Sequence, residues 1–403
     1  MNHFFMALLL SLPTSGMAMS FTEAINKIKA HDKLASISSQ AKADMEKSSE
    51  AGSWGDPMLK ITGKNFPADS LKDDQTPMTG MEVAISQRLP LSNKYSHKEE
   101  SLEKMSQAKQ WQASYTENQL ISMLWKHLIS LRKLQEQQGI IKENIQWISK
   151  VIEVSKTLYS NGKVSQQGIL DLKIRKSELK SQLFEKKFAI NSTKEQIRYL
   201  VGADGAHIDL STVPWQQLKF QQSQDTSKDP MELSLKSSLE SKSAATNAAS
   251  SNRVPDITIG LGYTMRSDID NNGDFVSLSA QIPLPVSSKR GAAFRKNLLD
   301  QKSAEQSLAN YKRQRDADLK SLEFNHQSLS AQLNTLRTES ISFAKNAREI
   351  TMKSYRLGTA TYIALLQSEI KLQNLQMKRS DLVARRSLNS VQYKSILGAK
   401  LYD

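Results

Sequence analysis

The sequence contains no cysteine among its 403 residues, and aromatic side chains make up only 6% of it. Without cysteine the chain has no disulfide bonds, no thiol nucleophile and no lipid-modified amino-terminal cysteine. Lys, Gln, Ser, Leu and Glu are common, which is typical of long helices that bury little surface. We therefore do not expect a conventional set of globular domains.

Glycine and proline are also scarce, with 16 and 10 copies, and they gather in residues 52–91 and 254–291. Because these two residues interrupt regular structure, the stretches almost free of them are predicted to be long uninterrupted helices. No stretch beyond the amino terminus approaches about 18 consecutive apolar residues, so the sequence predicts no transmembrane helix.

The amino terminus has the features of a secretory signal peptide. Its apolar run from Phe4 to Leu12 is too short to span a bilayer, and Gly16 and Ala18 form a small-residue cleavage site. We expect residues 1–18 to be removed from an exported chain. An uncleaved anchor is the alternative.

The formal net charge of +14 first suggests nucleic acid as a partner. The basic residues, however, are interspersed with acidic ones along the chain and do not form a single basic run. An exported chain also rarely meets nucleic acid. We therefore expect no nucleic-acid partner.

The chain contains an internal duplication, whose two copies differ by 196 in residue number. Tyr159 and Gly162 recur as Tyr355 and Gly358, and each glycine is followed by an Ile-Leu or Leu-Leu pair. Further matches at this offset are Ile140 with Leu336, Trp147 with Phe343, Val154 with Ile350, Leu179 with Leu375, and residues 200–202 with 396–398. A constant offset over about sixty residues indicates that both halves use one supersecondary motif.

Apolar residues within this motif recur at heptad spacing. In the second half they are Leu322, Leu329, Leu336, Phe343, Ile350 and Leu357. Sustained heptads predict coiled-coil packing. In the first half we expect a helix over about 92–160, roughly 100 Å long at 1.5 Å per residue, and a second helix that returns to about 200. Gly162 and Gly358 would each end a helix by adopting a positive φ.

Four shorter segments alternate between apolar and small or polar residues. The strands they predict span about 57–66, 79–90, 255–266 and 274–284. Val276, Leu278 and Ala280, for example, alternate with Ser277 and Ser279. Such alternation over roughly ten residues is typical of strands in outer-membrane barrels. A hairpin that packs on a soluble core is the alternative.

If these strands span a membrane, several copies of the chain must combine them. An unpaired strand edge in hydrocarbon costs several kcal/mol for each backbone group, and the smallest barrels of this kind have about eight strands. Two copies would supply eight strands and three copies twelve. The sequence alone does not choose between them.

These features resemble the TolC-like family of outer-membrane efflux proteins. The resemblance rests on the duplicated strand–strand–long helix–glycine turn–helix motif and on the two Tyr-x-x-Gly turns, and it covers about residues 20–400. The segments VPDITIGLGY at 254–263 and IPLP at 282–285, which leads into KRGA at 289–292, are similar to the branch that serves heavy-metal efflux pumps of the cobalt–zinc–cadmium or copper–silver type.

The resemblance implies a mainly α fold with a small membrane β part. Three copies would form a β-barrel that is continued by an α-helical coiled-coil barrel. The implied division is a signal peptide at 1–18, a first repeat at 19–202 with a helical hairpin at about 92–200, an equatorial linker and helix at 203–252, and a second repeat at 253–403 with a hairpin at about 287–398. The implied partners are a periplasmic adaptor protein, an inner-membrane pump and outer-membrane lipid, in the outer membrane and periplasm of a Gram-negative bacterium.

The resemblance also implies functional residues at the two turns. The adaptor-docking candidates, by match to the family's tip motif, are Tyr159, Asn161, Gly162, Tyr355, Arg356, Leu357 and Gly358. The alternative is that these residues only shape the turns.

Channels of this family often close just beyond the turn with acidic residues, and the corresponding aperture candidates here are Asp171, Ala364 and Gln367. Only Asp171 is acidic, so the second half departs from that pattern. Three copies of Asp171 in the lumen would favour cations. A solvated position on the helix surface is the alternative.

No cofactor, metal site or catalytic activity is expected. The histidines His3, His31, His97, His127, His207 and His326 never fall at a ligand spacing such as i, i+4. The segment from Asp268 to Asp274 imitates the start of a calcium loop, but Ser279 stands where a bidentate Glu is required, so a polar turn is expected. Four methionines in or beside the strands (Met58, Met78, Met81 and Met265) could touch soft metal ions, although packing or lipid contact is the preferred interpretation.

The sequence and its resemblance together predict the passive outer-membrane channel of a tripartite efflux system with a pump of the resistance–nodulation–division (RND) type, exporting heavy-metal cations. The alternatives are multidrug efflux, type I protein secretion, and a periplasmic structural coiled coil without a pore. We expect no enzyme.

Overall fold

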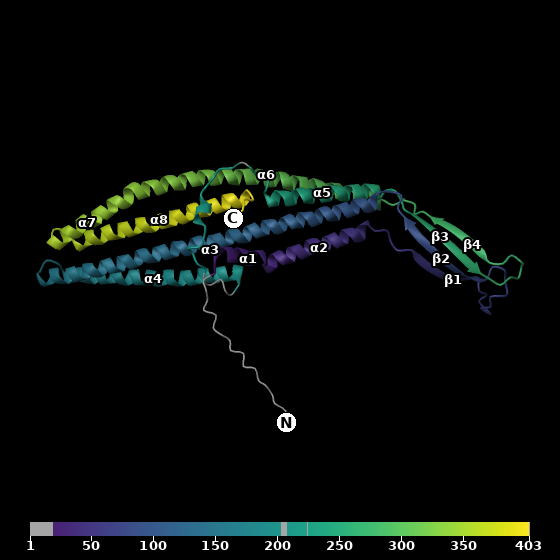
Figure 1. Cartoon of the computed structure of the whole chain (residues 1–403), viewed down its shortest axis with the longest axis horizontal. Helices are drawn as coiled ribbons and strands as arrows, with labels where there is room; N and C mark the ends of the chain where they lie inside the picture. The colour runs from purple at the N-terminus through teal and green to yellow at the C-terminus, as the bar shows by residue number, and fades with distance from the viewer. Residues whose placement is uncertain (1–18, 203–207, 224, 403) are drawn as a thin grey trace, which may run out of the picture. The chain divides into compact units, whose positions relative to one another are not determined.

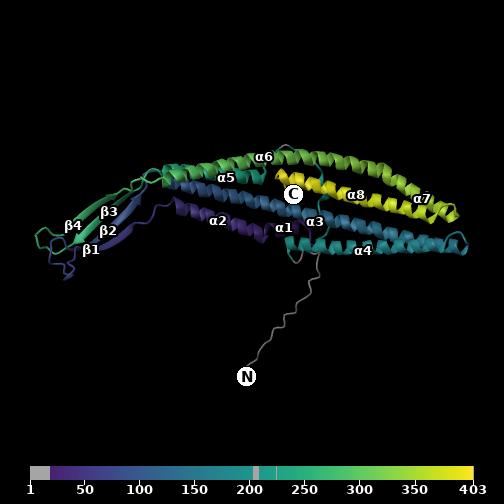
Figure 2. The same cartoon turned by 180° about the vertical axis from the view of Figure 1, so that it is seen from behind.

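The structure is a computed structural model that describes residues 19–202, 208–223 and 225–402. The expected signal peptide at 1–18 and part of the expected linker at 203–252 lie outside the described residues. Figures 1 and 2 show the chain from two opposite sides, with long helices and one small sheet. The expected fold class, mainly α with a small antiparallel β part, is confirmed.

Each half of the chain contains two strands that are followed by a helical hairpin. In the first half these elements are β1 (Met58–Lys64), β2 (Gly80–Leu89), α3 (Lys94–Ser160) and α4 (Gln166–Val201). In the second half they are β3 (Ile257–Met265), β4 (Phe275–Gln281), α6 (Lys289–Thr335), the π turn η3 (Leu336–Ser340), α7 (Ile341–Leu357) and α8 (Tyr362–Ile396). The remaining helices are α1 (Phe21–Lys29), α2 (Asp32–Gly52), the 3₁₀ turn η2 (Trp215–Leu218) and α5 (Pro230–Ser251).

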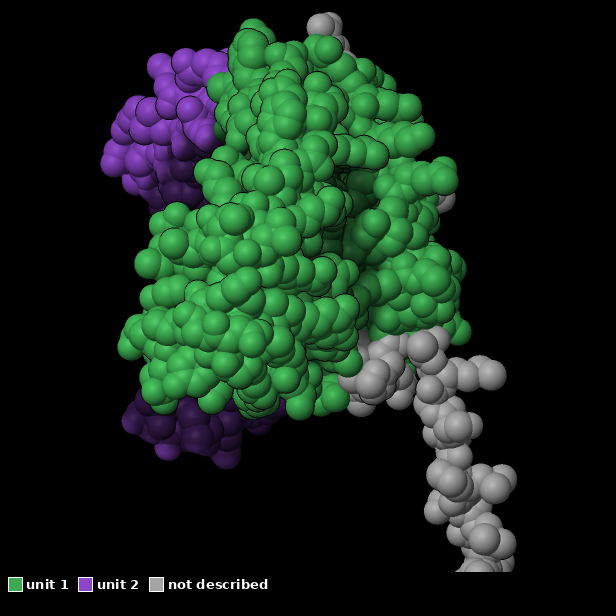
Figure 3. All heavy atoms as spheres, turned by 90° about the vertical axis from the view of Figure 1, so that its left-hand side faces the viewer, with its two compact units in different colours: residues 1–34, 115–229, 315–403 green, residues 35–114, 230–314 purple. Residues whose placement is uncertain are grey.

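The chain forms two compact units, which Figure 3 distinguishes by colour. Unit 1 comprises residues 1–34, 115–229 and 315–403, and unit 2 comprises residues 35–114 and 230–314. Each unit draws residues from both halves of the duplication. The long helices α3 and α6 each contribute residues to both units.

Unit 2 contains the sheet and helices that pack closely through serines. The four strands are antiparallel and lie in the order β1-β2-β3-β4, so the two halves of the duplication meet at the β2–β3 pair. Among the helices, the hydroxyl of Ser106 donates to the carbonyl of Ala41 at 2.7 Å, and that of Ser234 donates to the carbonyl of Ala108 at 2.8 Å. Small hydroxyl side chains allow the helices to approach closely while their polar atoms remain hydrogen-bonded.

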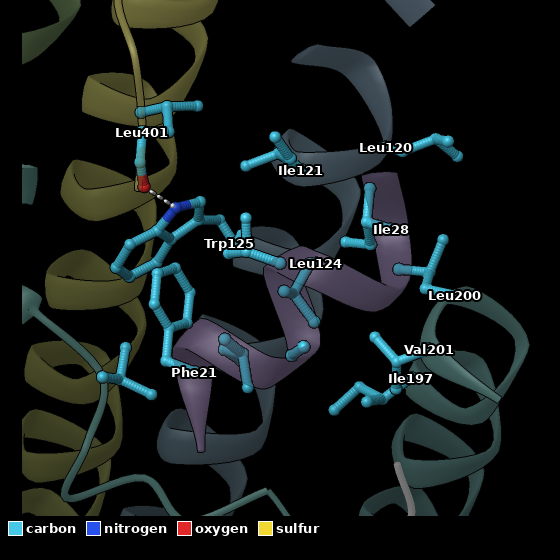
Figure 4. Packing of buried hydrophobic residues seen from close by; sticks show 14 of the residues in the cluster. Phe21, Ile28, Leu120, Ile121, Leu124, Trp125, Ile197, Leu200, Val201 and Leu401 are labelled. Atoms are coloured by element: carbon cyan, nitrogen blue, oxygen red, sulfur yellow. Dashed lines mark hydrogen bonds between the residues drawn. The ribbon is translucent and has the colours of Figure 1, made fainter. Parts of the chain in front are cut away.

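Unit 1 has an apolar core centred on Trp125, which is fully buried. Helix α1 begins with a capping box, in which the hydroxyl of Ser20 accepts from the backbone of Glu23, and this start places Phe21 against the indole at 5.0 Å between ring centroids. The indole nitrogen donates to the carbonyl of Leu401 at 2.9 Å (Figure 4). The core therefore joins a helix near the amino terminus to the last residues of the chain.

The heptad stripe predicted in the second half does not remain buried along its whole length. Leu329 and Leu336 are buried, whereas Phe343, Ile350 and Leu357 are exposed. The π turn η3 accounts for the change, because a π turn adds one residue to the helical repeat and rotates all later side chains. After this turn Ile341 and Ala344 are buried instead. Within the single chain the predicted heptad stripe is therefore buried only at Leu329 and Leu336.

We predict that Trp125→Ala lowers the stability of the chain by about 3–5 kcal/mol, because it removes a fully buried indole and leaves a cavity. The loss of helicity on heating or in denaturant, followed by circular dichroism, measures the change. The matched control is Trp54→Ala in unit 2, where the indole is exposed and the effect should stay within about 0.5 kcal/mol. Equal effects of the two substitutions would contradict a core centred on Trp125.

Candidate functional site

Two regions of the chain have unusual surfaces, namely the sheet in unit 2 and the two glycine turns in unit 1. The register of the sheet places large apolar side chains in rows across one face. One row is Leu59, Ile85, Leu261 and Leu278, and the next is Ile61, Val83, Tyr263 and Val276. All of these side chains are exposed in the single chain, and Leu278 reaches 80% exposure.

The opposite face of the sheet carries small and polar residues. One row is Lys60, Ala84, Gly262 and Ser277, and the next is Thr62, Glu82 and Thr264, followed by Phe275 as the one large apolar side chain in these two rows. The ammonium of Lys64 lies 2.6 Å from the carboxylate of Glu82 on this face. The two faces of the sheet therefore differ sharply in polarity.

Both edges of the sheet lack a partner strand within the described part of the chain. β1 pairs only with β2, and β4 pairs only with β3. Within the same described residues, no helix is both long and apolar enough to cross a membrane.

The loop between β3 and β4 is organised by Arg266. The guanidinium lies 2.7 Å from the carboxylate of Asp270, donates to the carbonyls of Gly273 and Pro77, and lies 4.0 Å above the ring of Phe275. This arginine supplies the positive charge within the loop that resembles the start of a calcium site. Among the described residues, no three His, Asp or Glu side chains are placed to hold a metal ion.

The two glycine turns have the same backbone design. Gly162 and Gly358 adopt φ values of 69° and 79° and end α3 and α7. In both turns, the residue after the glycine donates its N–H to a helix carbonyl: Lys163 to Leu158 and Thr359 to Ser354, each at 2.9 Å. Serine or threonine then caps the following helix, with Ser165 accepting from Gly168 and Thr361 from Ala364.

Six of the seven docking candidates are exposed at these turns. They are Tyr159, Asn161, Gly162, Arg356, Leu357 and Gly358. The exception is Tyr355, which is 1% exposed and whose hydroxyl lies 2.7 Å from the hydroxyl of Ser155 on α3. Burial raises the pKa of Tyr355, so the phenol stays neutral. Its side chain holds α7 against α3 and is not at the surface, whereas the equivalent Tyr159 is 48% exposed.

The three aperture candidates lie near the starts of α4 and α8. Asp171 is half-buried and accepts a hydrogen bond from Gln167 at 2.9 Å. It also accepts from the hydroxyl of Tyr362 on α8, and this bond raises the pKa of Tyr362. Ala364 and Gln367 are exposed on α8. Asp171 is therefore tied to the second hairpin by Tyr362, a residue that sequence reasoning missed.

Sequence reasoning also missed a buried polar network between α4 and α8. Glu369 is 0% exposed, and its carboxylate lies 3.4 Å from Arg175. Arg175 also donates to Gln373, whose amide donates to Gln182 at 3.1 Å. Burial raises the pKa of Glu369, although the Arg175 charge acts in the opposite direction. The available signal was spacing, because Leu365, Glu369 and Leu372 follow the four-three rhythm of a buried helix face.

Comparison with known proteins identifies the fold. No family model matches the chain, and no curated protein matches it. Among solved structures, the outer membrane protein VceC of Vibrio cholerae is 16% identical with a TM-score of 0.77, over 93% of this chain and 95% of that one. The CusC structure, which concerns transmembrane channel formation, is 13% identical with a TM-score of 0.81, over 95% and 93% of the two chains.

The CmeC outer membrane channel of Campylobacter jejuni gives a similar result, with 12% identity and a TM-score of 0.76 over 97% of this chain and 90% of that one. The chain therefore has, over nearly its whole length, the fold of these outer-membrane channel proteins. At such identities the likeness establishes the fold alone.

We predict that Glu369 makes stability fall as pH rises. Because its pKa in the folded chain is raised above the ordinary 4.5, the folded state binds the proton more tightly, so the stabilising contribution is complete below about pH 4.5 and is lost as pH rises through the raised pKa. Thermal unfolding at a series of pH values measures this loss.

The variant Glu369→Gln should remove this part of the pH dependence, whereas Glu185→Gln, at an exposed carboxylate on α4, should retain it. An unchanged pH profile for Glu369→Gln would contradict the assignment.

Proposed function

We propose that the chain is one subunit of a homotrimeric outer-membrane channel in a tripartite efflux system. The observation that carries the proposal is a four-stranded sheet with one apolar face and two edges that lack partners among the described strands. Hydrocarbon does not satisfy unpaired N–H and C=O groups, so a sheet that enters a bilayer must close into a barrel. Three copies supply twelve strands, the assembly that the family resemblance implies.

In this proposal the two faces of the sheet meet different surroundings. The apolar rows that include Leu261 and Leu278 face lipid, and the rows that include Gly262 and Ser277 face water in the lumen. Alternation of this kind is the property that allows a strand to lie between lipid and a water-filled pore. The small lumen-facing residues Ala84 and Gly262 leave the interior open.

The helical hairpins line the water-filled path on the periplasmic side. The exposed turn residues Asn161, Arg356 and Leu357 are proposed to dock the periplasmic adaptor, which couples the channel to an inner-membrane pump. Asp171, held by Tyr362, lies where the first hairpin meets the second and is the proposed aperture residue. Energy comes from the pump, and this chain provides a passive path with no chemical step.

Heavy-metal cations are the proposed cargo, and the support for them is the pair of motifs at 254–263 and 282–285. Multidrug efflux and type I protein secretion are the alternatives. The pump and adaptor encoded beside the gene distinguish the three, because cargo is chosen before it enters the channel. The proposed signal peptide would export the chain to the periplasm, from which the sheet is proposed to enter the outer membrane.

The proposal predicts that the chain fractionates with outer membranes as a heat-modifiable trimer and conducts ions in a planar bilayer. Leu278→Arg, on the apolar face, should greatly reduce insertion, since arginine facing lipid costs about 2–4 kcal/mol per subunit. The matched control is Ser277→Arg, which adds the same side chain to the opposite face of the same strand and should still insert.

A chain that stays monomeric and soluble without detergent, or a similar loss with both arginines, would overturn the channel assignment. The first result would favour a periplasmic coiled coil without a pore.

A further inference from the structure

Unit 1 shows how the first helical hairpin (α3 and α4) packs against the second (α7 and α8), which we call the within-chain contact. The two hairpins are copies of one motif, with residue numbers that differ by 196. In a closed ring of copies, the second hairpin of one chain also meets the first hairpin of the next. Each residue pair of the within-chain contact therefore has an expected counterpart between copies. It is found by adding 196 to the residue number in the first hairpin and subtracting 196 from the residue number in the second.

The first pair to convert is the hydroxyl contact between Ser155 and Tyr355. Its counterpart joins Thr351 of one copy to Tyr159 of the next. The local geometry supports this equivalence, because Thr351 donates to the carbonyl of Ala347 at 2.8 Å just as Ser155 donates to that of Val151 at 2.8 Å. Tyr159 is half exposed in the single chain, so its ring is available to a second copy.

An exposed apolar face in the second hairpin supports the same partner. Trp147 and Val154 of the first hairpin pack against the apolar cluster at the within-chain contact. Their counterparts Phe343 and Ile350 are exposed in the single chain. The first hairpin of a second copy would cover them if it packed here in the same geometry as the within-chain contact.

The buried polar network between α4 and α8 has no equivalent between copies, because its charged residues are not repeated at the 196-residue offset. Arg175 and Glu369 correspond to Lys371 and Lys173, while Gln182 corresponds to Lys378. All three lysines are exposed in the single chain. An attractive buried pair within the chain is therefore replaced between copies by a cluster of like charges.

We propose that the copy-to-copy contact keeps the tyrosine–hydroxyl pair, as Tyr159 with Thr351, but replaces the Glu369–Arg175 pair by Lys173, Lys371 and Lys378. This inference rests on the proposed trimer. Within a subunit the charge of Arg175 offsets part of the cost of burying Glu369, whereas the facing lysines of neighbouring subunits repel one another at the same level. The tunnel end therefore separates between copies and not within them, and added salt tightens it by screening the lysines.

Cysteine cross-linking tests the geometry, since the chain has no cysteine of its own. In the full-length channel, Tyr159→Cys combined with Thr351→Cys should give covalent dimers and trimers with a short bismaleimide. The matched control combines Tyr159→Cys with Thr338→Cys, which lies roughly 20 Å further along the helix at 1.5 Å per residue and should give no such ladder.

The outcomes separate this inference from the proposed function. Native trimers without a ladder, or equal ladders from both pairs, would overturn the copy-to-copy contact and leave the channel intact. Absence of trimers in the unmodified chain would instead remove the proposed function itself.

Charge-changing substitutions test the proposed repulsion between lysines of neighbouring copies. Lys173→Glu together with Lys371→Arg rebuilds the within-chain pair between copies and should lower channel conductance by about tenfold while trimers still form. The double variant should also lose the proposed tightening of the tunnel end by added salt. Lys187→Glu, at an exposed lysine on α4, is the control for charge alone and should conduct normally. Unchanged conductance in the double variant would refute the lysine cluster.

Discussion

The constraint on which the proposed assembly depends is the demand of hydrocarbon for satisfied backbone hydrogen bonds. β1 and β4 each have one free edge among the described strands, and the apolar rows on one face suit lipid and not water. These two facts conflict in a single chain, because the apolar face favours insertion into a membrane whereas the unpaired edges oppose it. Closure with sister chains removes the conflict. In the proposed assembly, a monomer is therefore an incomplete structure.

Duplication provides a simple way to build such a closed assembly. Both hairpins end in a glycine with positive φ and a hydroxyl cap, so one local solution serves two positions in each chain. Identical residues of the two copies nevertheless have different surroundings in the single chain. Tyr355 is buried against Ser155, whereas its counterpart Tyr159 is exposed. Tyr355 already has its partner within the chain, and in the proposed trimer Tyr159 would find its partner in the next subunit.

Much of the fold could be predicted from the sequence, because it depends on periodicity and on glycine. Alternation along Val276–Gln281 marks a strand, and Gly162 and Gly358 mark the two turns. The side-chain contacts could not be predicted in this way. The π turn at Leu336–Ser340 has no glycine or proline to mark it, and it shifts which heptad residues are buried. The Tyr362–Asp171 bond and the Glu369–Arg175 pair join helices that lie far apart in sequence, so spacing can mark Glu369 as buried but cannot identify the partner in either pair.

Arg266 gives the β3–β4 loop a property that a bound metal ion would not. A calcium loop holds several carboxylates around a divalent cation, and binding of that cation is coupled to folding. Here the compensating cation belongs to the polypeptide, and it contacts Asp270 and the carbonyls of Gly273 and Pro77. We therefore expect the conformation of this loop not to depend on a divalent cation in the medium.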